Sequence, residues 1–429
     1  MGIFGTSGIR RVADKELFKI AFRTGLAIGS MYRKVVVGRD TRTTSSALRH
    51  AVITGVLAGG AECADAGIVP TPTLAYAARN FNAGVMITAS HNPPEYNGIK
   101  LFNPDGSSFS EQQQVAIEQA VNYETNIATW KDFHPDFPIP QAIEDHIHRI
   151  LQDVPHNLSL KVVVDCAGAA AYRITPSVLN SMGCEVIPLN IEPTGYFPHD
   201  PEPVETNLRG LIQKVKDTGA DLGIAHDGDA DRMMAIDNRG RFISGDKMLV
   251  ILAREAGVDR VVTTIDASMS LERSGFQVIR TKVGDPYVSE TLKQEKLYFG
   301  GEPSGAWVFS SFSFCPDGPY AAARLVKFAS QNNLADIIDS IPSFPVRRGS
   351  IQGQGLNLDK LENKLKILRP VSISRTDGLK IDFLDGWLLV RPSGTEPKIR
   401  ITAEALTEDR SNELYIIAEK IISDTLKGM

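Results

Sequence analysis

A serine and the turn that carries it have the clearest potential for chemistry. Ser90 lies in the stretch Thr-Ala-Ser-His-Asn-Pro, directly after the apolar run Ala83–Ile87, which reads as a buried strand. Pro93 and Pro94 prevent simple continuation of either a strand or a helix. We therefore expect Ser90 on a tight turn at a strand end, where open α/β sheets bind ligands. An ordinary polar turn is the alternative interpretation, and it would stand if this stretch occurred alone.

Three aspartates form the second candidate stretch, Asp-Gly-Asp-Ala-Asp-Arg. Asp227, Asp229 and Asp231 are spaced at i, i+2 and i+4 between small residues, so the chain can curl until all three carboxylates face one point. Mg²⁺ prefers such oxygen ligands, and a cation offsets the repulsion among the three anions. A calcium EF-hand is excluded because its twelfth position would be Asn238 rather than glutamate. An acidic surface turn is less favoured because an apolar strand precedes the loop and Arg232 follows it.

Two further stretches are rich in anion-binding donors. The loop Gly5–Arg10 combines glycines with a guanidinium, and the later turn Arg-Pro-Ser-Gly-Thr-Glu-Pro offers a guanidinium, two hydroxyls and free N–H groups. A phosphate is the natural ligand for the later turn, although each stretch is also compatible with a plain turn. The candidate phosphate-binding residues of that turn are Arg391, Ser393, Gly394 and Thr395.

Two other positions are candidates through their surroundings. Glu302 and Ser304, flanked by glycines, could accept hydrogen bonds from sugar hydroxyls, although that loop alone would be a turn. Lys100 lies on a short expected strand, 98–102, that returns close to the Ser90 turn. A solvated surface lysine is the default interpretation elsewhere in the chain.

The composition bounds the class of protein. The 429 residues are 42% hydrophobic and 23% charged with a net charge of −5, which is typical of a soluble globular protein and gives no reason to expect nucleic acid or membrane as a partner. No apolar run approaches the roughly 18 residues that span a bilayer. The first residues lack the basic region and apolar core of a signal peptide. Four scattered cysteines fit a reduced compartment, so we expect the cytoplasm.

Strands that alternate with helices predict mostly parallel, doubly wound α/β sheets, with a smaller α+β unit at the C-terminus. We place the domains at residues 1–138, 139–240, 241–342 and 343–429, with the proline-rich stretch Phe133–Pro140 as a linker. The expected helices cover 15–30, 45–57, 111–122, 208–218, 246–255, 268–274, 317–330, 358–368 and 409–426. The expected strands cover 35–37, 83–87, 98–102, 161–165, 185–189, 221–226, 261–265, 276–281, 379–383, 387–390 and 398–402, with a hairpin over 233–243.

Taken together, the motifs TASHNP, DGDADR, GEPSG and RPSGTEP resemble those of the α-D-phosphohexomutase family, and the match runs from Phe4 to the C-terminus. The resemblance implies three related α/β domains and a smaller fourth one around a central cleft. It implies that Ser90 carries a phosphoryl group and that Mg²⁺ is bound by a phosphoserine oxygen with Asp227, Asp229 and Asp231. It places three cations around the reacting phosphate: Arg10, Lys100 and Arg232. It assigns the sugar to Glu302 and Ser304, and the second phosphate to Arg391, Ser393, Gly394 and Thr395.

One position departs from the family. Many relatives carry histidine directly after the GExSG loop, where this chain has Ala306. His91 is a catalytic candidate as the neighbour of Ser90, but it is not an obvious replacement for that histidine. Lys100 is therefore our candidate for general acid or base work.

The resemblance implies a reaction in which phosphoserine donates to a hexose phosphate, and Ser90 takes back the other phosphate of the resulting bisphosphate. A hexose 1,6-bisphosphate is then a possible activator. The stretches TASHNPPEYNGIK and GEPSGAW look most like archaeal members, which favours conversion of glucosamine 6-phosphate to glucosamine 1-phosphate. Phosphomannomutase or phosphoglucomutase activity, a non-catalytic sugar-phosphate sensor and a phosphatase with an aspartyl nucleophile in the Asp227 loop are the alternatives. The oligomeric state is left open.

Overall fold

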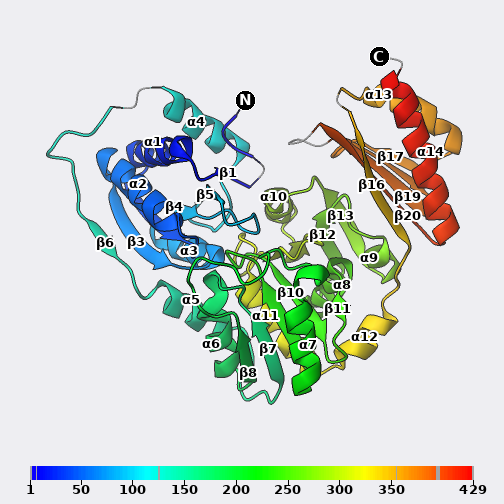
Figure 1. Cartoon of the computed structure of the whole chain (residues 1–429), viewed down its shortest axis with the longest axis horizontal. Helices are drawn as coiled ribbons and strands as arrows, with labels where there is room; N and C mark the ends of the chain where they lie inside the picture. Colours follow the sequence, from blue (N-terminus) through cyan, green and yellow to red (C-terminus); the bar gives the residue numbers. More distant parts are fainter. Residues whose placement is uncertain (1, 6, 124–125, 354, 393–396, 428–429) are drawn as a thin grey trace. The chain divides into compact units, whose positions relative to one another are not determined.

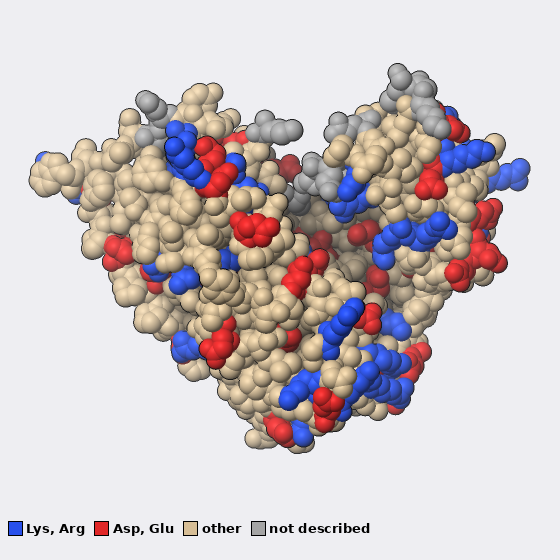
Figure 2. All heavy atoms as spheres, in the orientation of Figure 1, with Lys and Arg blue, Asp and Glu red and all other residues tan. Residues whose placement is uncertain are grey.

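A computed structural model of the chain describes residues 2–5, 7–123, 126–353, 355–392 and 397–427. It packs into two compact units, residues 1–258 with 284–338 and residues 259–283 with 339–429. Figure 1 labels the helices and strands along the chain. On the face drawn in Figure 2, acidic and basic side chains are interspersed. None of the helices among the described residues is long and apolar enough to cross a bilayer.

The first unit begins with a six-stranded sheet in the order β1-β5-β4-β2-β3-β6. Strands β2, β3, β4 and β6 run parallel; β5 pairs antiparallel with β4, and β1 pairs antiparallel with β5. Buried, mostly apolar runs form the central strands β2 and β4, as expected for a sheet covered on both faces. The elements are β1 (Ile9–Val12), α1 (Lys15–Met31), β2 (Lys34–Arg39), α2 (Ser45–Ala58), β3 (Glu62–Ile68), α3 (Thr71–Ala77), η1 (Ala78–Asn80), β4 (Ala83–Ile87), β5 (Tyr96–Phe102), α4 (Glu111–Asn122) and β6 (Asp136–Pro138).

Glycines set the contact between α1 and α2, which lie side by side over this sheet (Figure 1). A Cβ added at Gly25 would lie 2.2 Å from the carbonyl oxygen of Val52, and one at Gly29 would lie 2.2 Å from that of Val56. A Cβ added at Gly55 would likewise lie 2.2 Å from the carbonyl oxygen of Phe22. The two backbones therefore touch directly, without side chains between them.

A second sheet, ordered β11-β10-β9-β7-β8, follows in the same unit. Strands β8, β7 and β9 are parallel, and β10 and β11 continue as an antiparallel hairpin. Its elements are α5 (Ala142–Leu151), β7 (Lys161–Asp165), η2 (Ala170–Tyr172), α6 (Ile174–Ser181), β8 (Glu185–Leu189), η3 (Glu205–Asn207), α7 (Arg209–Thr218), β9 (Leu222–His226), β10 (Met233–Asp237) and β11 (Phe242–Ile243).

The rest of the first unit is mostly helical, with one pair of short strands. The chain continues through α8 (Gly245–Ala256), α10 (Asp285–Glu295), the antiparallel pair β14 (Phe299–Gly301) and β15 (Trp307–Phe309), α11 (Gly318–Ala329) and α12 (Leu334–Ser340). Asp317 caps α11 by accepting the N–H of Tyr320, as its position before the helix suggests.

The second unit combines a parallel strand pair with an antiparallel sheet. Strands β12 (Arg260–Thr264) and β13 (Gln277–Thr281) are parallel, with α9 (Ser270–Arg273) between them. The sheet has the order β16-β20-β19-β18-β17, and all its neighbours are antiparallel. Apolar residues of α13 and α14 complete its core. These elements are β16 (Val346–Gln352), α13 (Leu358–Leu365), η4 (Lys366–Leu368), β17 (Ser372–Ser374), β18 (Leu379–Phe383), β19 (Gly386–Pro392), β20 (Lys398–Ala405) and α14 (Glu408–Lys427).

The predicted class, doubly wound α/β units followed by a smaller α+β unit, is confirmed, whereas the exact domain limits stay predictions. The linker prediction is wrong in part, because Asp136–Pro138 forms the edge strand β6 beside β3. The loop prediction for Gly5–Arg10 is wrong at its end, because β1 begins at Ile9. Strands β3 and β16 were not predicted, since their sequences, ECADAGI and VRRGSIQ, lack a continuous apolar run.

The glycine contact between α1 and α2 predicts a position-specific stability loss. Gly25→Ala places a methyl group against the Val52 carbonyl and should destabilise the protein by roughly 1–3 kcal/mol. The control is Gly210→Ala on α7, where an added Cβ meets nothing within 4 Å. That variant should gain up to about 1 kcal/mol from helix propensity. Denaturant unfolding of both variants measures the difference, and an equal effect would contradict the direct backbone contact.

Candidate active site

Ser90 lies where predicted, on the turn that follows β4, and is almost completely buried. Its backbone has a φ of 54°, a left-handed conformation that is uncommon for serine. Its N–H donates to Thr88 Oγ1 at 2.9 Å, and its hydroxyl donates to Asp227 Oδ2 at 2.7 Å. The turn thus places the hydroxyl directly against the aspartate loop.

The aspartate loop follows β9, and Asp227, Asp229 and Asp231 are all buried. Ala230 has a φ of 57°, so the loop curls as the alternation with small residues suggests. One ligand oxygen from each of the three carboxylates lies within 4.8 Å of the others. The structure therefore brings the three predicted metal ligands together.

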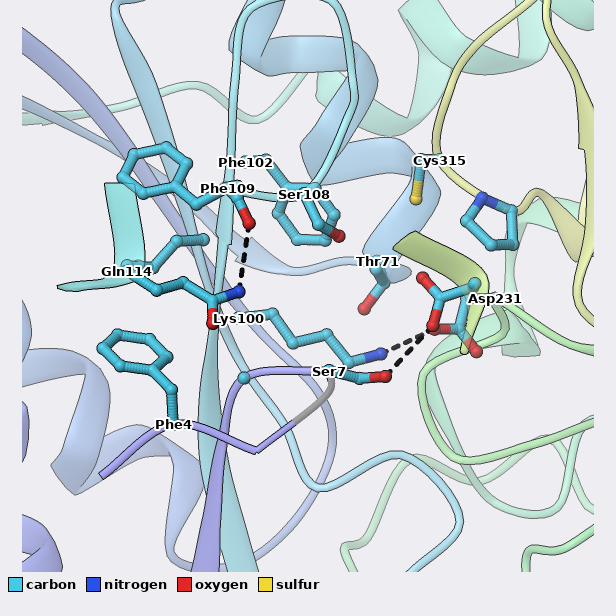
Figure 3. A pocket seen from close by; sticks show the side chains of 14 residues that line it. Phe4, Ser7, Thr71, Lys100, Phe102, Ser108, Phe109, Gln114, Asp231 and Cys315 are labelled. Atoms are coloured by element: carbon cyan, nitrogen blue, oxygen red, sulfur yellow. Dashed lines mark hydrogen bonds and ion pairs between the residues drawn. The ribbon is translucent and has the colours of Figure 1, made fainter. Parts of the chain in front are cut away.

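Lys100, on β5, contacts this cluster through its ammonium group. Its Nζ lies 2.7 Å from Asp229 Oδ2 and 2.6 Å from Asp231 Oδ2, and Figure 3 shows it pointing toward Asp231. Burial alone would lower the pKa of Lys100, but the attraction of the two carboxylates outweighs it and raises that pKa. Lys100 is therefore a charged ammonium at neutral pH, and not a surface lysine.

The three carboxylates differ in their electrostatic environment. Burial, reinforced by the charges of Asp231 and Asp229, raises the pKa of Asp227 well above its ordinary value. Burial also acts on Asp229, but the charge and hydrogen bond of Lys100 and the Thr71 hydroxyl lower its pKa overall. Oδ1 of Asp229 is buried and has no hydrogen-bond partner among the described residues. This unsatisfied oxygen within a cluster of carboxylates fits a hard divalent cation.

The remaining catalytic candidates, His91, Arg232 and Arg10, contact the Ser90 turn or the aspartate loop. His91 Nδ1 lies 3.3 Å from Ser90 Oγ, and burial together with the charges of Arg232 and Arg10 lowers the pKa of His91 to about 2. Arg232 donates its backbone N–H to Asp227 Oδ1 at 3.2 Å. Although burial opposes it, the carboxylates of Asp227 and Asp231 raise the pKa of Arg232. Arg10 extends from β1 and donates to Asn92 Oδ1 at 3.5 Å.

Glu302 and Ser304 form the tight turn between β14 and β15. Ser304 Oγ donates to Glu302 Oε2 at 3.3 Å, and Glu302 Oε1 accepts the N–H of Gly284 at 2.7 Å. Ala306, where the resemblance led us to expect histidine, is buried and forms an isolated β-bridge with Arg232. The departure from the family pattern therefore lies beside one of the predicted catalytic cations.

Arg391 lies next to the last residue of β19 in the second unit, and the turn residues Ser393, Gly394 and Thr395 lie outside the described residues. Arg391 Nε forms an ion pair with Asp377 Oδ2 at 2.8 Å. The same carboxylate oxygen accepts the backbone N–H of Val283 at 3.1 Å. Asp377 thus holds the arginine predicted to bind phosphate.

The structure adds three residues that the sequence did not reveal. Thr71, at the start of α3, hydrogen-bonds Asp229 through its hydroxyl. Asp285, the first residue of α10, accepts the hydroxyl of Ser7 at 3.1 Å, and both line the small cavity of Figure 3 with Lys100. Burial, followed by the charge of Asp231, raises the pKa of Asp285. The only sequence signal for Asp285 was its place after a glycine at a helix start.

Comparison with known proteins identifies the family. Four phosphoglucomutase/phosphomannomutase models match: alpha/beta/alpha domain I over residues 1–128, domain II over 144–240, domain III over 244–344 and the C-terminal domain over 352–415. A probable phosphoglucosamine mutase of Methanocella arvoryzae is 47% identical over 430 residues, with 98% of each chain covered. A phosphoglucosamine mutase of Methanococcus maripaludis is 40% identical, with 96% of this chain and 97% of the relative covered.

A solved structure agrees with this assignment. The phosphoglucomutase/phosphomannomutase family protein of Burkholderia thailandensis superposes with a TM-score of 0.87 at 26% identity, covering 99% of this chain and 97% of that one. Each of the four motifs lies inside one of the four matched domain models. The chain therefore belongs to the phosphoglucomutase/phosphomannomutase family and is an enzyme of the isomerase class.

Proposed function

We propose that this enzyme moves a phosphoryl group between O6 and O1 of a hexose phosphate, with Ser90 as the covalent carrier. The observation that carries the proposal is the buried Ser90 hydroxyl, 2.7 Å from Asp227 within a cluster of three carboxylates. A serine so placed has both a fixed direction of attack and a site for a charge-neutralising cation. Relatives named phosphoglucosamine mutase, 40–47% identical over nearly the whole chain, support glucosamine 6-phosphate as the substrate.

Mg²⁺ is the cation we propose for the carboxylate cluster. Asp227, Asp229 and Asp231 would hold it, with an oxygen of phosphorylated Ser90 as a further ligand. When bound, the ion neutralises charge on the transferring phosphoryl group. The unsatisfied Oδ1 of Asp229 supports this assignment, since a buried carboxylate oxygen otherwise has its hydrogen bonds met.

The proposed reaction begins with phosphorylated Ser90. A free hydroxyl of the sugar attacks the phosphorus, the bond to Ser90 Oγ breaks, and a hexose 1,6-bisphosphate results. The bisphosphate then reorients in the site. Ser90 attacks the other phosphate of the bisphosphate and regains a phosphoryl group. The proton lost by the attacking hydroxyl passes to the departing serine oxygen. Lys100 is our candidate for this general acid or base work, and its raised pKa keeps it a positive charge beside the carboxylates. His91, with its pKa near 2, is too weak a base to hold a proton at neutral pH.

Other residues orient the substrate in this proposal. Arg10 and Arg232 offset charge on the reacting phosphate, and Glu302 with Ser304 binds the sugar hydroxyls. Arg391 with Ser393, Gly394 and Thr395 binds the phosphate that is not reacting. Because these residues bind the phosphate and not one face of the sugar, the substrate can bind in either of the two orientations that the reaction needs. We place the enzyme in the cytoplasm and propose a hexose 1,6-bisphosphate as an activator that rephosphorylates Ser90.

Phosphomannomutase or phosphoglucomutase activity is the second candidate. It rests on the sugar-binding turn, because Glu302 and Ser304 can pair with hydroxyls of any hexose. Discrimination for a 2-amino group requires a dedicated polar partner, since shape alone separates such close analogues poorly.

The first prediction tests the covalent carrier. Ser90→Ala should lower kcat by at least about a thousandfold, because the phosphoryl acceptor is lost. Intact-mass measurement should show one phosphate on the parent enzyme and none on the variant. Ser181→Ala, an exposed serine at the end of α6, is the matched control and should keep both activity and the phosphate. Near-normal turnover in Ser90→Ala would remove Ser90 from the mechanism.

The second prediction concerns the cation. Saturating Mg²⁺ at a hundredfold excess over its Kd should stabilise the parent by about 2.7 kcal/mol. Asp227→Asn should lose this gain and the activity, yet the metal-free variant should be more stable than the metal-free parent, because one buried negative charge is gone. The pKa of Asp227 is raised in the folded state, so this difference should shrink as the pH falls through it.

Thermal unfolding with and without EDTA measures these differences. Asp217→Asn on the exposed face of α7 is the control and should respond to Mg²⁺ like the parent. Full activity in EDTA, or an unchanged Mg²⁺ response in Asp227→Asn, would refute the proposed metal site.

The third prediction is substrate preference. Side-by-side kcat/KM values for the 1-phosphates of glucosamine, mannose and glucose should be highest for glucosamine 1-phosphate, as the named relatives suggest. A tenfold or greater preference for mannose 1-phosphate over the amino sugar, an outcome worth about 1.4 kcal/mol, would replace the first candidate with the second.

A further inference from the structure

The turn that carries Ser90 is held by the side chain of a buried arginine, Arg42. Four backbone carbonyls of this turn converge on the guanidinium of Arg42, which follows β2. Nη2 donates to the carbonyls of Ser90 and Asn92 at 2.8 and 2.6 Å, and Nη1 donates to those of Pro93 and Tyr96 at 2.7 and 3.0 Å. One side chain therefore holds both ends of the turn.

The rest of the guanidinium is also satisfied. Nε donates to Asp40 Oδ2 at 3.1 Å, and both side chains of this ion pair are fully buried. The guanidinium carbon lies over the ring of Phe197, from the loop after β8, 5.0 Å from the ring centre. Only arginine supplies five N–H donors in a fixed planar fork, so lysine cannot reproduce these contacts.

The Ser90 carbonyl is also where the turn meets the aspartate loop. A Cβ added at Gly228, between two of the aspartates, would lie only 2.4 Å from the carbonyl oxygen of Ser90. Arg42 binds that same oxygen from its own side. The guanidinium and the glycine together set the distance between the serine and the carboxylates.

We propose that Arg42 is a positioning residue for phosphoryl transfer: it holds the Ser90 turn so that the serine oxygen stays in line with the reacting phosphate. The inference rests on the proposed function and extends it to a residue that does not touch the substrate. Loss of the fork lets the turn shift, and displacements of about 1 Å cost roughly a hundredfold in rate. The sugar and its distal phosphate are bound by other residues, so substrate affinity should remain.

The experiment measures kcat and KM of the full-length enzyme carrying Arg42→Lys and Arg42→Met. We expect kcat to fall about ten- to a hundredfold in Arg42→Lys and further in Arg42→Met, with KM within about threefold of the parent. Arg49→Met, which removes the ion pair of Arg49 with Asp65 in the same sheet domain, is the control. It should change stability without changing kcat.

Two results would overturn the proposal: a kcat of Arg42→Lys within threefold of the parent, or a loss that appears in KM and leaves kcat unchanged. If Arg42→Met fails to fold, Arg42→Lys decides the question, because it keeps a positive charge beside Asp40. Failure of the proposed function is distinguishable, since Ser90→Ala would then stay active. If Ser90→Ala is inactive while Arg42→Lys turns over normally, only the positioning role is wrong.

Discussion

Three buried like charges in one short loop are the constraint on which the rest of the site depends. Uncompensated, Asp227, Asp229 and Asp231 would repel one another in a region from which water is excluded. The structure answers with contacts from several elements: the Ser90 hydroxyl on Asp227, the Thr71 hydroxyl on Asp229, and the Lys100 ammonium on Asp229 and Asp231. The contacts that stabilise the carboxylates are thus the same ones that bring Ser90 and Lys100, the proposed nucleophile and cation, to one loop.

Local patterns were enough to predict much of this arrangement. Valine-rich runs identified the central strands, and the spacing of the three aspartates indicated their convergence. The prediction that Ser90 lies on a strand-end turn holds because prolines at 93 and 94 leave few other conformations. Strands such as β3 and β6 escaped prediction, because partners distant in sequence stabilise them rather than an apolar pattern of their own.

The supporting residues of the site were harder to predict for a related reason. Arg42, Thr71 and Asp285 occupy unremarkable positions in the sequence, and their importance arises only when separate elements meet. The turn from 393 to 396 lies outside the described residues, so the roles of Ser393, Gly394 and Thr395 stay predictions. Within the second unit, Asp377 pairs with Arg391 and accepts the N–H of Val283; within the first, Glu302 accepts the N–H of Gly284.

The backbone of Ser90 also bears on which amino acid could serve as the proposed phosphoryl carrier. Its φ of 54° lies in a region that serine enters at modest cost, whereas a β-branched residue becomes a genuine outlier there. Threonine has the same hydroxyl, but its additional methyl group restricts the backbone away from this conformation. The geometry of the turn thus favours the primary alcohol of serine over the secondary alcohol of threonine before any substrate is bound.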